Sequence, residues 1–190
     1  MTDNVRAEVI PPNPDIPVVR IFCDYAAEGV WGYPGYYEEY YAWTMKTDKE
    51  ADLEALESMG HSEDLRHWGR DLALLRELEQ WNAQFDYGHL AWTYFLQGWG
   101  EPVDLTVFDP DTFTETGLQL AFRMKQHHPD WIVTFDDQVA SDRAFYSSDD
   151  KAIYADTSFS YIVEIGAKNG MVLIPCEWKD GRPFPKQCSA

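Results

Sequence analysis

The chain has 190 residues, of which 33 are acidic and 15 are lysine or arginine, so its formal net charge is −18. Hydrophobic residues make up 45% of it and aromatic residues 15%, proportions that a disordered chain does not reach. A surplus of negative charge this large repels nucleic acid and anionic membranes and speeds encounters with cationic partners. The alternative interpretation is an acidic surface that only maintains solubility.

The sequence has no feature typical of a membrane or secreted protein. The longest apolar runs, such as Met171–Ile174, are far too short to cross a bilayer. The first ten residues carry Asp3 and Glu8 and lack the apolar centre of a signal peptide. The odd number of cysteines leaves no complete disulfide framework, and no CxxC spacing indicates a zinc site. We therefore expect a cytoplasmic protein that does not bind membranes.

Residues 1–17 contain four prolines and predict an extended lead-in. The β-branched, apolar run at 18–23 follows and predicts a first strand in the middle of a sheet. Residues 24–41 are rich in glycine and tyrosine, and the Gly-Tyr-Pro-Gly run at 32–35 predicts a turn. The stretch Tyr36–Trp43 is left open between a short helix and an edge strand. A short polar helix is expected at 49–58.

Two longer helices are expected in the middle of the chain. Ser62 is a good N-cap for the first, in which leucines and tryptophans recur at helical spacing up to about residue 84. The aromatic segment at 86–101 is treated as a separate stretch. The second helix is expected from Asp111 to just before Pro129, with Thr112 and Glu115 at the spacing of a capping box.

The last third of the chain predicts mainly strands. Residues 131–135 have the composition of a strand, 136–150 that of an acidic loop, and 153–165 that of one or two further strands. A strand at 171–174 follows an Asn-Gly turn, and a polar tail is expected from residue 179 to 190. The order of elements predicts a single α+β domain over 18–178, with a mixed sheet of about five strands and two main helices on one face.

No catalytic motif stands out. The chain lacks the GxSxG, HExxH, GxGxxG and Walker patterns. His127 and His128 are adjacent, so on a helix they point in different directions and are poorly placed to share a metal ion. Close acid pairs, such as Asp109 with Asp111, are expected by chance among so many acids. We therefore predict no catalytic residue, no metal site and no cofactor.

The candidate residues are those suited to binding another protein. Tyrosine is enriched in binding surfaces because it is large, stiff and amphipathic, and carboxylates would contact a cationic partner. The aromatic candidates are Tyr33, Tyr36, Tyr37 and Tyr146, and the acidic candidates are Asp136, Asp137, Asp142, Asp149 and Asp150.

Several packing motifs resemble those of small acidic bacterial proteins, some of which look like immunity proteins from toxin–immunity loci. The resemblance covers residues 18–135. It is carried by the run Val19–Tyr25, by Val30-Trp31, by a helix with Leu65, Leu72, Leu75 and Trp81, and by a helix with Phe113, Gly117, Leu120 and Ala121 that leads into a strand at Trp131. It implies a protein that binds and neutralises a toxin.

Our leading hypothesis is therefore a binding protein that occludes a cationic antibacterial toxin domain in the producing cell. Acidic side chains would meet the basic groove of the toxin, and aromatic anchors would fill its pocket. The alternative is a carboxylate-based hydrolase or glycan-binding module with an aromatic cleft. A homodimer formed by exposed aromatic side chains is a third possibility.

Overall fold

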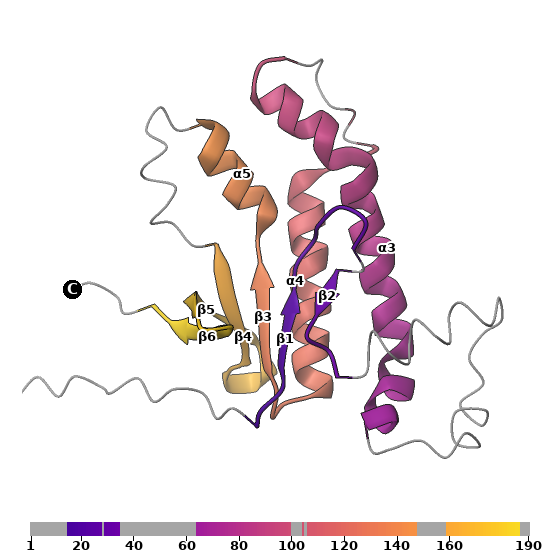
Figure 1. The fold of residues 1–190 in the computed structure, drawn as a ribbon, viewed down its shortest axis with the longest axis vertical. Coiled ribbons are helices and arrows are strands. Elements are labelled where there is room, and N and C mark those ends of the chain that lie inside the picture. Colours follow the sequence, from indigo (N-terminus) through magenta and orange to yellow (C-terminus); the bar gives the residue numbers. More distant parts are fainter. Residues whose placement is uncertain are drawn as a thin grey trace, which may run out of the picture.

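The computed structural model describes the chain in segments. Strands and helices are given below with their bounds, and Figure 1 shows their arrangement. In α3 the side chains are described from Arg70 onward. The described residues are 15–27, 29–34, 64–99, 104, 106–147 and 159–186.

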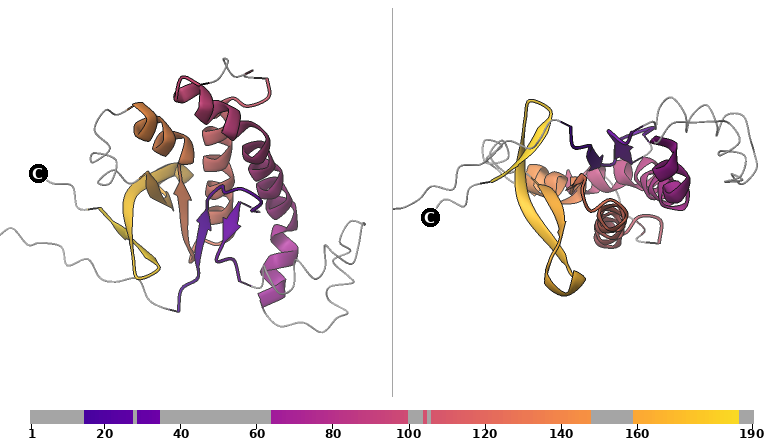
Figure 2. Two further views of the ribbon diagram at one scale, coloured as in Figure 1. Left: turned by 45° about the horizontal axis from the view of Figure 1, so that its top comes forward. Right: turned by 90° about the horizontal axis from the view of Figure 1, so that it is seen from below.

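The fold is α+β and is built on one mixed sheet of six strands in the order β2-β1-β3-β4-β5-β6. Strands β1 and β3 run parallel, and every other neighbouring pair is antiparallel. The sheet twists, so that β5 and β6 point away from the direction of β1 and β3 (Figure 2). The strands are β1 (Val18–Ile21), β2 (Val30–Trp31), β3 (Ile132–Asp136), β4 (Ser160–Ile165), β5 (Met171–Lys179) and β6 (Arg182–Pro185).

Three helices are described: α3 (Asp64–Leu96), α4 (Pro110–His127) and α5 (Gln138–Ser147). α3 and α4 lie side by side against one face of the sheet, and α5 continues from the end of β3 (Figure 1). The prediction of an α+β fold with two main helices on the sheet is confirmed, with six strands instead of about five. No helix in the described ranges combines the length and apolarity needed to span a bilayer.

The core lies between the helices and the sheet. Trp81 of α3 stacks on Phe113 of α4 at 4.7 Å between ring centroids, and its indole N–H donates to the Phe113 carbonyl at 2.9 Å. Gly117 makes this approach possible, because a Cβ there would lie 2.5 Å from the Trp81 ring and 2.7 Å from that of Phe135. The interface between α3, α4 and β3 is therefore closely packed around one glycine.

α3 is longer than predicted. Phe85, His89, Trp92 and Leu96 continue its inward stripe beyond residue 84 at helical spacing. The helix continues through Gly88. A glycine stands here because Phe108 packs directly against it: a Cβ added at Gly88 would lie 2.3 Å from the Phe108 Cβ. Residues 86–96 of the aromatic segment expected as a separate stretch therefore form the last turns of α3.

The second helix is capped by a different residue from the one predicted. Asp109 is the N-cap of α4, where its carboxylate accepts from the Asp111 amide at 3.2 Å and from the Thr112 hydroxyl at 2.6 Å. Pro110 occupies the first helical position, which its fixed φ favours. The capping box expected at Thr112 and Glu115 is therefore replaced by an Asp-Pro start.

Two expectations for the last third of the chain are wrong. The acidic stretch 136–150 is not a loop, because α5 spans Gln138–Ser147 of it. The polar tail does not start at 179, because Arg182–Pro185 forms edge strand β6. Asp180 (φ 50°) and Gly181 (φ 74°) form a two-residue turn between β5 and β6, a sequence pair typical of tight hairpins. The short helix expected at 49–58 lies outside the described residues.

Candidate functional site

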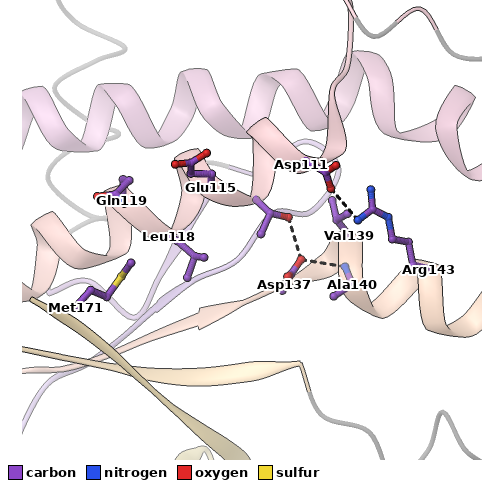
Figure 3. A pocket seen from close by; sticks show the side chains of 10 residues that line it. Asp111, Glu115, Leu118, Gln119, Asp137, Val139, Ala140, Arg143 and Met171 are labelled. Carbon is purple, nitrogen blue, oxygen red and sulfur yellow. Dashed lines mark hydrogen bonds and ion pairs between the residues drawn. The ribbon is translucent and has the colours of Figure 1, made fainter.

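A groove of about 340 Å³ lies between α4 and α5, beside the carboxyl end of β3 (Figure 3). One wall is contributed by α4, the other by the start of α5, and β5 contributes one residue. The lining residues are Asp111, Thr114, Glu115, Leu118, Gln119, Asp137, Val139, Ala140, Arg143 and Met171.

The α4 wall is one face of the helix. Its five lining residues occupy positions 111, 114, 115, 118 and 119, the spacing at which side chains line up along one side of an α-helix. Asp111, Glu115 and Gln119 are exposed at the rim, and Leu118 is half-buried. The wall therefore combines a polar, acidic edge with an apolar base.

Asp137 joins the two walls. It follows β3 directly and caps α5, because its carboxylate accepts from the Ala140 amide at 2.9 Å. The same oxygen accepts from the Thr114 hydroxyl of α4 at 3.1 Å. Figure 3 shows both hydrogen bonds at the centre of the groove. The carboxylate is thus held in place by both helices and remains half-exposed.

Arg143 is the single basic residue of the lining. Its guanidinium bonds Asp111 across the end of the groove at 2.8 Å and lies 5.8 Å from the centre of the Trp92 ring. Both members of the ion pair are substantially exposed, so the pair contributes little stability. A cationic partner group could exchange with Arg143 at Asp111 at small cost.

The groove matches the chemistry of a lysine or arginine side chain. Leu118, Val139 and Met171 form an apolar base on which an aliphatic stem could lie. The lining contains three carboxylates, those of Asp111, Glu115 and Asp137, against one guanidinium. Among the described residues no group of three histidine, cysteine or acidic side chains is placed to hold a metal ion.

Of the predicted acidic residues, Asp137 lies in the groove and two others lie inside the protein. Asp136 is on the opposite side of the strand from Phe135, and its carboxylate is paired with Arg20 of β1. Arg20 in turn lies 4.6 Å from the ring centre of Phe22 and 4.9 Å from that of Trp178. Asp136 therefore holds strands together on the second face of the sheet.

Asp142 is part of a hydrogen-bonded chain in which it and His89 are buried and Tyr25 is half-exposed. It bonds His89 of α3 at 2.5 Å, and the other ring nitrogen of His89 bonds the Tyr25 hydroxyl at 2.8 Å. Phe85 stacks on His89 at 3.8 Å between ring centroids. Burial is the main reason why the pKa of Tyr25 is raised, so its phenol stays protonated at neutral pH. The chain Asp142–His89–Tyr25 fixes α5 to α3.

Tyr33 is also inside the protein. Only 4% of it is exposed, and its hydroxyl donates to Asp71 at 2.7 Å. Burial, and then the neighbouring Asp71 charge, raise the pKa of Tyr33 far above its ordinary value. His127 and His128 bond the same carboxylate, so the adjacent histidines share a buried acid.

The remaining predicted residues either do not line the groove or lie outside the described part. Tyr146 is half-buried on α5, where its ring lies edge-on to Phe145 at 5.0 Å. Four predicted residues lie outside the described part of the chain: Tyr36, Tyr37, Asp149 and Asp150.

The sequence alone does not indicate most of the groove. Asp111 and Glu115 are predicted only as residues of the helix start, and the sequence does not single out Thr114 or Leu118. A signal was present, because these side chains share one face of a predicted helix. The second wall cannot be predicted, because the sequence predicts a loop over 136–150, where Arg143 lies.

Comparisons with family models, with curated proteins and with solved structures find no match to this chain. The proposal below therefore rests on the geometry of the groove and on charge.

Proposed function

We propose that the chain is a binding protein for a cationic protein and that the groove between α4 and α5 receives a basic side chain of that partner. The observation that supports this is the set of three carboxylates above an apolar base. Asp137 is held by hydrogen bonds from both helices, so little ordering is needed when a cation binds. The net charge of −18 adds long-range attraction for the same partner.

The biological form of the proposal is an immunity-type protein of the cytoplasm, which binds a basic antibacterial toxin domain and occludes its active groove. The acidic surplus and the loose sequence resemblance support it. The glycan-binding or hydrolase alternative depends on an aromatic cleft. No residue that lines the groove is aromatic, which favours the protein-binding hypothesis.

Charge reversal inside and outside the groove tests the binding step. Glu115→Lys changes the groove, and Asp130→Lys makes the same change of net charge at an exposed position that does not line it. With a lysine-rich peptide as the probe, we expect Glu115→Lys to weaken binding by about ten-fold, and Asp130→Lys by about two-fold through the general field alone. Calorimetric titration measures both. Equal effects of the two variants would show that the groove is not the binding site.

A growth experiment tests the immunity role. A basic toxin domain encoded beside the gene for this chain should arrest growth when expressed alone, and co-expression of the chain should restore growth. The Glu115→Lys chain should restore it less well than the Asp130→Lys chain at equal expression. A chain that restores no growth although it binds the lysine-rich peptide would contradict the immunity role and leave the binding function intact.

A further inference from the structure

The last turns of α3 expose an apolar, aromatic surface that the groove does not use. We call it the aromatic face, and it consists of Tyr87, Leu90, Tyr94, Phe95 and Trp99. The exposed fractions are 83% for Tyr87 and 78% for Trp99, and between 43% and 49% for the other three. Side chains of this size are normally buried when they occur together, so a continuous patch of them indicates an interaction site.

The five side chains gather at the carboxyl end of α3. Tyr87, Leu90 and Tyr94 follow one another at helical spacing on the same side of α3. The helix then ends in a turn that returns the chain to this side, with the Trp99 amide bonding the Tyr94 carbonyl at 3.0 Å and the Gly98 amide bonding the Phe95 carbonyl at 2.9 Å. Gly98 has the left-handed φ of 74° that this helix ending requires.

The surface is also held firmly from behind. Phe85, His89 and Trp92 lie on the buried side of the same turns, and Phe108 packs against Gly88. The end of α3 extends past the strands in Figure 1. Four of the five residues of the aromatic face are therefore presented on the helix, and Trp99 lies in the turn that ends it.

The aromatic face carries no charge in a chain that is 25% charged. The thirteen residues from Tyr87 to Trp99 include no aspartate, glutamate, lysine or arginine. The aromatic face therefore has no carboxylate that could pair with a cationic partner, which would be attracted only by the net negative charge of the chain. It is, however, a surface on which two copies of this acidic chain can meet without placing carboxylates opposite each other.

The exposed area is sufficient for such a pair. With 150–250 Å² for each large aromatic side chain, the exposed fractions amount to roughly 600 Å² per copy, or about 1,200 Å² for two copies. Stable interfaces between proteins begin near this size. We propose that the chain forms a homodimer in which the aromatic faces of two α3 helices pack together around a two-fold axis.

Salt separates this proposal from the function proposed above. Two copies that each carry −18 repel one another, so added salt should strengthen the dimer by screening the repulsion. A cationic peptide is attracted electrostatically to the acidic chain, so added salt should weaken its binding by screening that attraction. Either proposal can therefore fail while the other holds.

The test is sedimentation equilibrium of the full chain at about 50 mM and about 300 mM salt, over concentrations from about 1 to about 300 µM. We expect a monomer–dimer equilibrium whose dissociation constant falls as salt rises. Leu90→Asp places a charge in the aromatic face and should raise that constant by about ten-fold or more. Ala73→Asp adds the same charge at an exposed position elsewhere on α3 and should change it by less than about three-fold.

Circular dichroism shows whether each variant is folded. If Leu90→Asp does not fold, Tyr94→Ser replaces it as the variant that changes the aromatic face. A chain that stays monomeric over the whole range at both salt concentrations would overturn the proposal. So would a dimer that the two face variants leave as stable as the native one.

Discussion

Asp71 is a carboxylate without exposed surface that accepts hydrogen bonds from three side chains. Tyr33 and His128 bond one oxygen, and His127 bonds the other at 2.6 Å. Burial alone would raise the pKa of Asp71, but the hydrogen bonds from His128, Tyr33 and His127 outweigh it and lower the pKa below its ordinary value of 3.8. The ionised form is therefore the one that the fold stabilises.

We expect Asp71→Asn to lower the free energy of unfolding by about 2–4 kcal/mol, because the amide turns a donor toward buried groups that are themselves donors. Urea denaturation at neutral pH measures the loss. Asp130→Asn, which changes an exposed acid, should cost less than about 0.5 kcal/mol.

The loss should also depend on pH in a defined direction. Because the folded pKa of Asp71 is below the unfolded value, its contribution is fully present above about pH 4 and disappears as the pH falls through the folded pKa. The difference between native and Asp71→Asn chains should thus shrink as the pH falls below about 4. A difference that already shrinks at pH 6 would show that another group controls it.

The two described cysteines are buried thiols. Burial raises the pKa of Cys176 to about 12 and that of Cys23 further still, so neither thiol ionises in the folded protein. In a Cys188→Ser background we expect both to react with an aromatic disulfide reagent only as fast as the protein unfolds. Rapid reaction under native conditions would contradict the burial of these strands.

At the scale of the elements, Gly117 sets the distance between α3, α4 and β3. Gly117→Ala should lower the free energy of unfolding by about 1–3 kcal/mol, because the methyl group would overlap the Trp81 and Phe135 rings. Gly98→Ala is the matched control at a position with no atom near the added carbon. Its cost should be only about 1 kcal/mol, which reflects the left-handed φ alone. Thermal denaturation of both variants gives the comparison.

The elements that the sequence predicts correctly are those whose apolar pattern is strong. Strand β1, strand β3 and helix α4 follow from runs of β-branched or helically spaced residues. The sequence does not predict α5, because the acidic composition of this stretch resembles that of a loop. Buried Val139 and Asp142 show that tertiary contacts, here with His89, decide its structure.

The groove is harder to predict than the strands for a physical reason. Its two walls are separated in the chain by β3, and only the packing of α5 beside α4 brings Arg143 to Asp111. Asp136 and Asp137 are neighbours in the chain, yet successive side chains at the end of a strand point to opposite sides. One therefore pairs with Arg20 inside the sheet, and the other lines the groove.

At the scale of the whole molecule, the charge of −18 opposes compact folding. Screening should relieve this repulsion, so we expect the melting temperature to rise by a few degrees between about 10 and 200 mM sodium chloride. Choline chloride at equal ionic strength should give the same rise. A melting temperature that falls with salt would mean that the ion pairs, such as Arg123 with Glu77 at 2.5 Å, outweigh the repulsion.

The two edges of the sheet have a consequence for how the chain behaves when it is concentrated. One edge is β2, with only two residues, and the other is β6, whose Pro183 and Pro185 have no N–H where an outward donor would stand. In the described sheet, both edges are therefore poor templates for a further strand, and we expect the native protein not to seed cross-β fibrils. Even near its isoelectric point, where repulsion vanishes, crowding should give amorphous or discrete particles instead of amyloid.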